Sequence, residues 1–317
     1  METGSPIGGK GSLRLGKNQR VTEECGKIAG MGFSISKWAK FIKLEHTLFA
    51  MPVGLAAMLL AAAGWPQRRV FLGVVVCLVG ARTAAMAFNR LADWQIDQRN
   101  PRTAARSTLV SKLAAWLTVG AGVVGLVGGA WILNPLCLIL SPLALGIVCF
   151  YSLTKRFTWT SHGFLGLALG TAPVGAWLAV QGRFTSWVPI VLGLAVGLWV
   201  AGFDLVYALQ DREFDRREGL KSFPARFGEG AALRLATGLQ VGSAGLLGAF
   251  GWMAGFGWRY GIVWLGICLV LGMEARPVRD ARFQEGEVIR LVARATRAHM
   301  EMSLLVLGGV VWEIFGK

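Results

Sequence analysis

Apolar runs long enough to cross a membrane dominate the sequence. They hold roughly 17–25 residues each, and a helix of that length spans the roughly 30 Å hydrocarbon core of a bilayer. Hydrophobic residues make up 54% of the chain and charged residues only 16%. An average soluble domain has about 25% charged residues. The sequence therefore predicts an all-α, polytopic membrane protein.

Nine transmembrane helices are predicted from these runs. Their ranges are 47–64, 70–91, 112–133, 135–153, 163–180, 187–208, 231–253, 259–273 and 302–315. Residues 1–34 are rich in Gly and Lys and lack an apolar stretch, so we expect a disordered cytoplasmic lead there. Residues 35–317 are predicted to form the membrane domain, which begins with a basic amphipathic segment suited to the membrane interface.

The net charge of +15 indicates how the chain is oriented in the membrane. With a cytoplasmic N-terminus, 27 of the 33 Lys and Arg residues fall in cytoplasmic segments, at 1–46, 89–112, 154–162, 204–234 and 274–299. This asymmetry follows the positive-inside rule. No basic patch is interleaved with aromatic residues on a soluble face, so the expected partner is the lipid bilayer and not a nucleic acid. No organelle-targeting segment is evident, and we expect a multi-pass protein of the bacterial cell inner membrane.

A first acidic cluster follows the second predicted span. It consists of Asn89, Asp93 and Asp97 in the segment AFNRLADWQID. Residues at i, i+4 and i+8 drift by only about 40° per step on an α-helix, so the three side chains would share one face.

A second acidic cluster follows the sixth predicted span and repeats this spacing. It consists of Asp204, Tyr207, Asp211 and Asp215 in the segment FDLVYALQDREFD. Both clusters would therefore lie at the cytoplasmic membrane face, as a weak internal repeat.

Carboxylates grouped in this way need a cation. Like charges at i, i+4 destabilise a helix, and carboxylates at membrane depth are costly. Mg²⁺ prefers oxygen ligands and binds through one or two carboxylates together with phosphate oxygens of a substrate. The clusters therefore indicate a Mg²⁺ site for a diphosphate, with Asp93, Asp97, Asp211 and Asp215 as the metal residues. The alternative interpretation is two solvated helix ends whose aspartates pair with neighbouring Arg residues.

Basic residues surround the two clusters. Arg82 lies inside an apolar run two helical turns before the first cluster, and an intramembrane Arg indicates a functional site. A structural salt bridge between Arg82 and Asp204 is the alternative. Arg102, Lys155 and Lys221 follow the acidic clusters or the fourth span and can donate charge-assisted hydrogen bonds to a diphosphate. Each of them is equally explained as a residue that fixes the topology.

The two clusters resemble the aspartate-rich motifs of the UbiA family of membrane prenyltransferases. The family pattern NxxxDxxxD is matched by Asn89, Asp93 and Asp97, and DxxYxxxDxxxD is matched by Asp204, Tyr207, Asp211 and Asp215. The segment 151–156 (YSLTKR) also resembles the family, and the resemblance covers about residues 35–315.

This resemblance implies nine helices around a central cavity with a cytoplasmic cap, where Mg²⁺ joins a diphosphate to both motifs. The implied reaction is Mg²⁺-dependent transfer of a polyprenyl group from a polyprenyl diphosphate to an aromatic acid such as 4-hydroxybenzoate, in ubiquinone or menaquinone biosynthesis.

The predicted roles divide the site residues into three groups. Tyr207 would line the allylic cation beside the four metal aspartates. Asn89, Arg102, Lys155 and Lys221 would lie near the phosphates, and Arg82, Lys43 and Asp204 would orient the acceptor.

Departures from the family pattern leave the acceptor open. KLEHTLFAMP at 43–52 replaces the RxDKP pattern of 4-hydroxybenzoate enzymes, and Arg90 stands where many ubiquinone-type members carry Asp. These segments are closer to prenyltransferases of the futalosine route to menaquinone, so a futalosine-derived benzoate is the alternative acceptor. Residues 297–303 (RAHMEMS) also lack an Asn that many relatives carry near the start of the last helix. Another aromatic compound, such as a haem-like ring, is a further possibility.

A membrane transporter is the alternative from a different functional class. A transporter would place polar groups or broken helices near the bilayer midplane in both halves of the chain. Here the acidic clusters lie at the predicted cytoplasmic ends, and only Arg82 and Asp204 lie deeper. This distribution favours the enzyme.

Overall fold

The computed structural model describes residues 34–275 and 285–316, which form helices and connecting loops without any strand. The predicted cytoplasmic lead lies outside the described residues, apart from Ser34. Ser34 caps the short helix α2 (Ile35–Phe41) by accepting a hydrogen bond from the backbone of Lys37.

Within the described part of the chain, nine helices have 18 residues or more. They are α3 (Leu44–Ala62), α4 (Arg68–Ala92), α6 (Lys112–Leu133), α7 (Pro135–Thr154), α8 (Ser161–Gln181), α9 (Val188–Tyr207), α12 (Glu229–Met253), α13 (Trp258–Ala275) and α14 (Glu285–Phe315). Each predicted span falls on one of these helices, so the apolar runs predicted the order of the long helices correctly.

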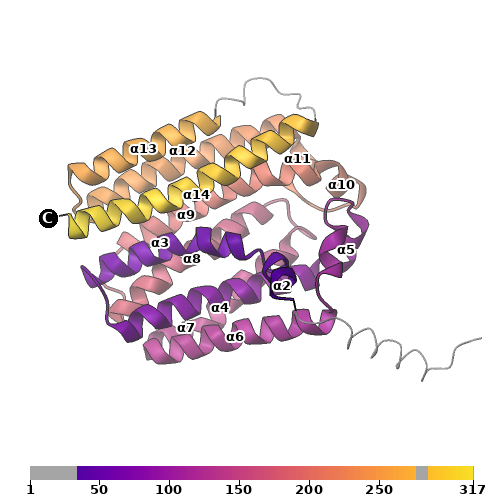
Figure 1. Cartoon of the computed structure of the whole chain (residues 1–317). Coiled ribbons are helices and arrows are strands. Elements are labelled where there is room, and N and C mark those ends of the chain that lie inside the picture. Colours follow the sequence, from indigo (N-terminus) through magenta and orange to yellow (C-terminus); the bar gives the residue numbers. More distant parts are fainter. Residues whose placement is uncertain (1–33, 276–284, 317) are drawn as a thin grey trace, which may run out of the picture.

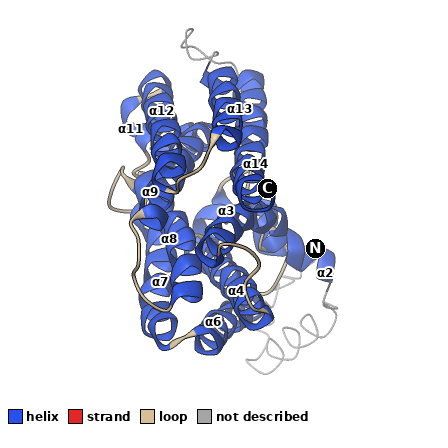
Figure 2. Ribbon diagram, turned by 90° about the vertical axis from the view of Figure 1, so that its left-hand side faces the viewer, coloured by secondary structure: helices blue, strands red, loops and turns tan. Residues whose placement is uncertain are grey.

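The long helices close into a ring in chain order. From α6 onward each packs against the next, α14 returns to α3, and α3 and α4 complete the circuit back to α6. Inside this ring α3 also contacts α8, and α14 contacts α9. Figure 1 shows the helices side by side along their length, and Figure 2 shows α12 to α14 on the opposite side of the bundle from α6 and α7.

The outer surface of the bundle suits a lipid environment. Six stretches of helix in the described chain are long and apolar enough to cross a membrane: α4, α6, α7, α8, α9 with its continuation to Arg217, and residues 286–315 of α14. Two shorter apolar helices, Met51–Ala62 and Trp258–Met273, accompany them. Large apolar side chains also point outward, including Ile139 at 73% exposure. The chain is therefore a multi-pass membrane protein.

Glycines allow α4 and α6 to approach closely. A Cβ atom on Gly122 would lie 2.5 Å from the backbone nitrogen of Ala84, and one on Gly80 would lie 2.6 Å from that of Leu126. Both positions therefore need glycine, and the glycine-rich segment 120–129 lets α6 approach α4 closely. Gly120 in the same segment faces open space.

The last helix is longer than predicted. The last predicted span covered only 302–315, and residues 274–299 were assigned to a cytoplasmic segment. In the structure α14 begins at Glu285 and runs for 31 residues. The charged residues Arg290, Arg294 and Arg297 belong to this helix. Because of their charge, this amphipathic part of the helix was not predicted as a span.

Short helices gather at one end of the bundle. They are α5 (Trp94–Arg99), η1 (Ala104–Thr108), η2 (Ala208–Asp211), α10 (Arg212–Arg217) and α11 (Phe223–Phe227). Figure 1 shows α5, α10 and α11 together at the same end of the long helices. These short helices carry Asp97, Asp211 and Asp215 of the two acidic motifs.

Candidate active site

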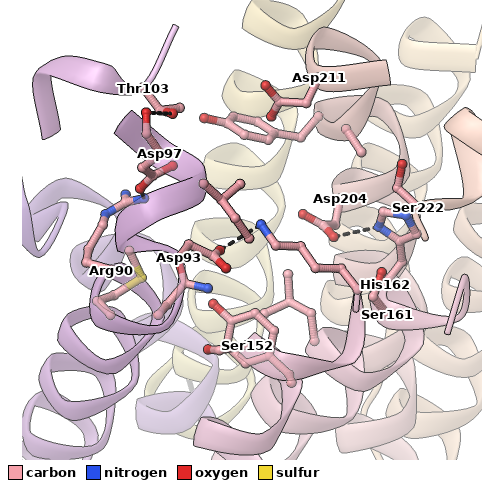
Figure 3. A pocket seen from close by; sticks show the side chains of 18 of the residues that line it. Arg90, Asp93, Asp97, Thr103, Ser152, Ser161, His162, Asp204, Asp211 and Ser222 are labelled. Atoms are coloured by element: carbon pink, nitrogen blue, oxygen red, sulfur yellow. Dashed lines mark hydrogen bonds and ion pairs between the residues drawn. The ribbon is translucent and has the colours of Figure 1, made fainter. Parts of the chain in front are cut away.

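A cavity of about 240 Å³ brings the two acidic motifs together. Of the predicted site residues, only Lys221 does not line it. Figure 3 shows Asp93 and Asp97 on one side of the cavity and Asp204 and Asp211 on the other. The charged side chains of the lining are Lys43, Arg82, Arg90, Arg102, Arg106, Lys155, Asp93, Asp97, Asp204, Asp211 and Asp215.

Neither motif lies on one regular α-helix, contrary to the simplest interpretation of its spacing. α4 ends at Ala92, and Asp93 at φ −92° and ψ 10° separates it from α5. The backbone of Asp93 still bonds Asn89, and that of Asp97 bonds Asp93, so all three side chains keep nearly one face. In the second motif the 3₁₀ helix η2 links α9 to α10 and shifts Asp211 and Asp215 relative to Asp204.

The carboxylates of the first motif are buried and paired with cations. Asp93, only 4% exposed, lies 2.7 Å from the ammonium of Lys155 and 3.3 Å from Arg156. Asp97 lies 3.7 Å from Arg90 and 3.6 Å from Arg106. The alternative of aspartates paired with neighbouring Arg residues is therefore partly right for this motif.

The second motif is joined to the first through Arg102. Arg102 forms a bidentate ion pair with Asp211, in which Nε of Arg102 donates a hydrogen bond over 2.8 Å. Asn100 donates a further hydrogen bond to Asp211, over 2.9 Å. Because Arg102 and Asn100 belong to the loop after α5, these contacts hold the two short-helix regions against each other.

Tyr207 lies between two cations. Its hydroxyl accepts hydrogen bonds from Lys43, over 3.1 Å, and from Arg102, over 3.4 Å. Both cations also lie over its ring, at 5.0 Å and 5.6 Å from the ring centre. The ring of Tyr207 thus favours positive charge beside it, which is consistent with its predicted place next to an allylic cation.

Lys43 reaches the cavity from the junction of α2 and α3. Its φ of 50° lies in the left-handed region, which costs a non-glycine residue free energy and is retained mainly where function needs it. Burial lowers the pKa of the Lys43 ammonium, although its contact with Tyr207 opposes this shift. The sequence placed Lys43 near the acceptor, and the structure places it against Tyr207.

Asp204 is paired with a histidine that the sequence did not single out. Nδ1 of His162, at the start of α8, lies 2.6 Å from the carboxylate of Asp204 in α9, as Figure 3 shows. This contact replaces the salt bridge between Arg82 and Asp204 that was considered from sequence. His162 is a lone His in the segment 154–162 that was predicted to be cytoplasmic, and it belongs to no spacing pattern, so only the fold reveals this pair.

The deep end of the cavity is formed by α4, α7, α8, α9 and α14. Arg82 lies there with Tyr151 and His299, and Leu169 and Val200 add apolar surface. Arg82 has no ion-pair partner among the described residues, and its Nε is buried without a hydrogen bond. An intramembrane cation without a partner fits an anionic ligand.

Lys221 lies outside the cavity. Its side chain is exposed and donates to the carbonyl oxygen of Phe157, over 3.3 Å. Its backbone nitrogen donates to the carbonyl oxygen of Lys155, over 2.7 Å. Lys221 therefore contacts the chain segment that carries Lys155.

The donor set fits a metal that arrives with its substrate. In the described residues no three acidic, His or Cys side chains are close enough together to hold a metal ion by themselves. Instead, Asp93 and Asp97 on one side of the cavity and Asp211 on the other are each ion-paired with a cation. Mg²⁺ commonly takes only one or two carboxylates and completes its shell with phosphate oxygens and waters, so the residues present suit a Mg²⁺–diphosphate.

Comparison with known proteins identifies the family. The UbiA prenyltransferase family matches residues 50–291, so the chain belongs to this family. The chain is 34% identical over 169 residues to the mitochondrial 4-hydroxybenzoate polyprenyltransferase of Arabidopsis thaliana, which covers 52% of this chain and 41% of that protein. It is 35% identical over 198 residues to the 4-hydroxybenzoate octaprenyltransferase of Alcanivorax borkumensis, covering 60% and 66% of the two chains. The chain thus spans less than two thirds of either relative.

Solved structures share the fold over a greater length. The apo structure of a UbiA homolog from Aeropyrum pernix has a TM-score of 0.75 and 30% identity, and covers 84% of this chain and 97% of that one. A UbiA homolog from Archaeoglobus fulgidus bound to GPP and Mg²⁺ has a TM-score of 0.62 at 17% identity, covering 86% and 99%. The ring of helices is therefore the UbiA fold.

Proposed function

We propose that this protein transfers a polyprenyl group from a polyprenyl diphosphate to an aromatic acid such as 4-hydroxybenzoate, in a Mg²⁺-dependent step of respiratory quinone biosynthesis. The observation that carries this proposal is the convergence of both acidic motifs and six basic side chains on one cavity. The named activities of the bacterial and plant relatives support the acceptor and the prenyl chain. The Archaeoglobus homolog, which binds GPP and Mg²⁺, supports the donor and the metal.

Asp93, Asp97, Asp211 and Asp215 would hold the metal with the diphosphate. Bound Mg²⁺ would supply positive charge that stabilises the departing diphosphate. In this structure Arg102 forms an ion pair with Asp211, and Lys155 forms one with Asp93, at the mouth of the cavity. With these carboxylates directed to a bound metal, Arg102 and Lys155 would be free to donate to phosphate oxygens, with Asn89 beside them.

The reaction replaces one bond at the prenyl C1 atom with another. The C1–O bond breaks and its electron pair leaves with the diphosphate, while a ring carbon of the acceptor forms the new C–C bond. The same ring carbon then loses its proton. Tyr207 would stabilise the positive charge at C1 through its ring face, and the apolar walls would exclude water from it.

Arg82 would bind the carboxylate of the acceptor at the deep end of the cavity. Asp204, held by His162, lies between this end and the second motif, where a carboxylate can accept the proton that the ring loses. The side chains thus divide the cavity into a diphosphate end and an acceptor end.

We further propose nine membrane crossings, with α3, α12 and α13 joining the six stretches that meet the length and hydropathy requirement. The short helices would then form a cytoplasmic cap. The Lys and Arg bias supports a cytoplasmic side for that cap and the N-terminus in a bacterial cell, where the helices would lie in the inner membrane.

The test is product formation by the purified protein in detergent or nanodiscs. The protein receives Mg²⁺, a labelled polyprenyl diphosphate, and either 4-hydroxybenzoate or a futalosine-derived benzoate. A product whose mass is the acceptor plus one prenyl group supports the proposal and identifies the acceptor. Uptake of the diphosphate into sealed vesicles without a covalent product would favour the transporter instead.

A further inference from the structure

Several buried polar atoms of the cavity lining lack hydrogen-bond partners, and two of them face the deep end. These two are Nε of Arg82 in α4 and Nδ1 of His299 in α14. Leaving a buried polar group unsatisfied costs about 1–3 kcal/mol, so such groups call for an explanation when they occur in a native fold. Both residues line the same cavity, where a bound ligand can satisfy them.

The ring of His299 is fixed in place by aromatic neighbours. It packs against Trp199 with ring centres 4.8 Å apart, and against Phe203 at 4.7 Å. Both neighbours lie on α9, whereas His299 lies on α14, so the stack joins two helices across the cavity wall. A ring held in this way presents its nitrogen in a constant direction, as a binding site requires.

The position of His299 separates it from the diphosphate end. Lys43, Arg102 and Lys155 serve that end and are paired with Tyr207, Asp211 and Asp93. His299 instead shares the deep end with Arg82 and with an apolar and aromatic wall. A planar aromatic ring with one anionic substituent matches these surroundings, because the wall takes the ring and two N–H donors suit the two oxygens of a carboxylate.

We infer that His299 is a specificity-determining residue of the acceptor site, where its Nδ1–H donates to the carboxylate of the aromatic acid beside Arg82. The inference rests on the proposed function and adds to it a second donor. Loss of one hydrogen bond to a charged group corresponds to roughly a tenfold or greater loss of affinity.

Two variants separate hydrogen bonding from packing. His299→Phe keeps an aromatic ring between Trp199 and Phe203 but removes the nitrogen. His299→Asn removes the ring but keeps a donor close to the position of Nδ1. KM is measured for 4-hydroxybenzoate, for its neutral analogue 4-hydroxybenzamide and for the polyprenyl diphosphate, and thermal unfolding checks that each variant is folded.

The inference predicts that His299→Phe raises the KM for 4-hydroxybenzoate about tenfold or more, while the other two KM values change less than twofold. His299→Asn should keep most of the preference for the acid over the amide. If His299 only packs, His299→Phe will behave as the wild type, and this result would overturn the inference. An equal rise of all three KM values would overturn it as well.

Direct binding of 4-hydroxybenzoate, measured by isothermal titration calorimetry, distinguishes this inference from the proposed function. Wild-type protein that forms no prenylated product contradicts the proposed function, whatever the variants do. Product formation together with unchanged binding of 4-hydroxybenzoate to His299→Phe contradicts the inference alone.

Discussion

Replacing Asp93 with Asn tests the role of the first motif with little change in shape. The side chain of Asp93 is 6% exposed, and its carboxylate has cations at 2.7 Å and 3.3 Å. The partners, Lys155 and Arg156, are 29% and 40% exposed and can be solvated when the negative charge is removed. We therefore expect Asp93→Asn to lower the free energy of unfolding by only about 1–2 kcal/mol, less than for a fully buried pair.

The expected loss of activity is much larger than this loss of stability. An Asn side chain cannot replace the carboxylate in the role proposed for Asp93, which is to hold the metal with the diphosphate. Removing one electrostatic group aimed at the charge of a transition state costs about 10²–10³ in turnover, or about 2.7–4 kcal/mol. Asp93→Asn should thus lower kcat by at least a hundredfold while the protein remains folded in the membrane.

The assay follows labelled prenyl product at saturating Mg²⁺ and substrates, with thermal unfolding in parallel. Glu218→Gln is the matched control, because Glu218 also forms an ion pair among the short helices, 3.0 Å from Arg99, but does not line the cavity. The control should keep near wild-type turnover. If Asp93→Asn retains more than half of the wild-type kcat, Asp93 is not a metal residue and the ion pair with Lys155 is structural.

Three further substitutions test separate parts of the account. Arg82→Leu removes the cation proposed for the acceptor carboxylate, so the KM for 4-hydroxybenzoate should rise by about tenfold or more with an unchanged KM for the diphosphate; a rise in the diphosphate KM alone would contradict this. His162→Ala leaves Asp204 without its partner and should lower kcat roughly tenfold with little change in either KM, as steady-state kinetics will show. Gly122→Leu places a side chain against the backbone of α4 and should lower stability by about 1–3 kcal/mol in thermal unfolding. Gly120→Leu faces open space and is the neutral control, so equal effects of the two would refute the packing argument.

The sequence predicted the long helices well because membrane spans depend on a simple quantity. Each needs about 20 apolar residues, and this requirement can be counted along the chain. The same counting rule missed the start of α14. The first half of this helix carries Arg290, Arg294 and Arg297, so it is not apolar enough to be counted, and its packing against other helices cannot be seen in the sequence. The breaks at Asp93 and η2 were also missed, because a spacing of four residues fits both a straight and an interrupted helix.

The site could be predicted from the sequence only where residues recur at a fixed spacing or stand out from an apolar run. Repeated aspartates at fixed spacing located both motifs, and an isolated Arg in an apolar run located Arg82. His162 and His299 have no such pattern, since neither has a second His or an acidic partner at a regular spacing on its own helix that would mark it as a site residue. Their importance depends on contacts with Asp204 and with the stacked rings of α9, which lie far away in the sequence.

The most direct test of the central claim is the product formed by the wild-type protein from a polyprenyl diphosphate and 4-hydroxybenzoate, measured by mass spectrometry with Mg²⁺ and with excess EDTA. The account predicts a carbon-prenylated aromatic acid in the presence of Mg²⁺, its loss in EDTA and its recovery when Mg²⁺ is restored. Equal product formation in EDTA would contradict the metal site, and no prenylated product from any aromatic acid would contradict the proposed function.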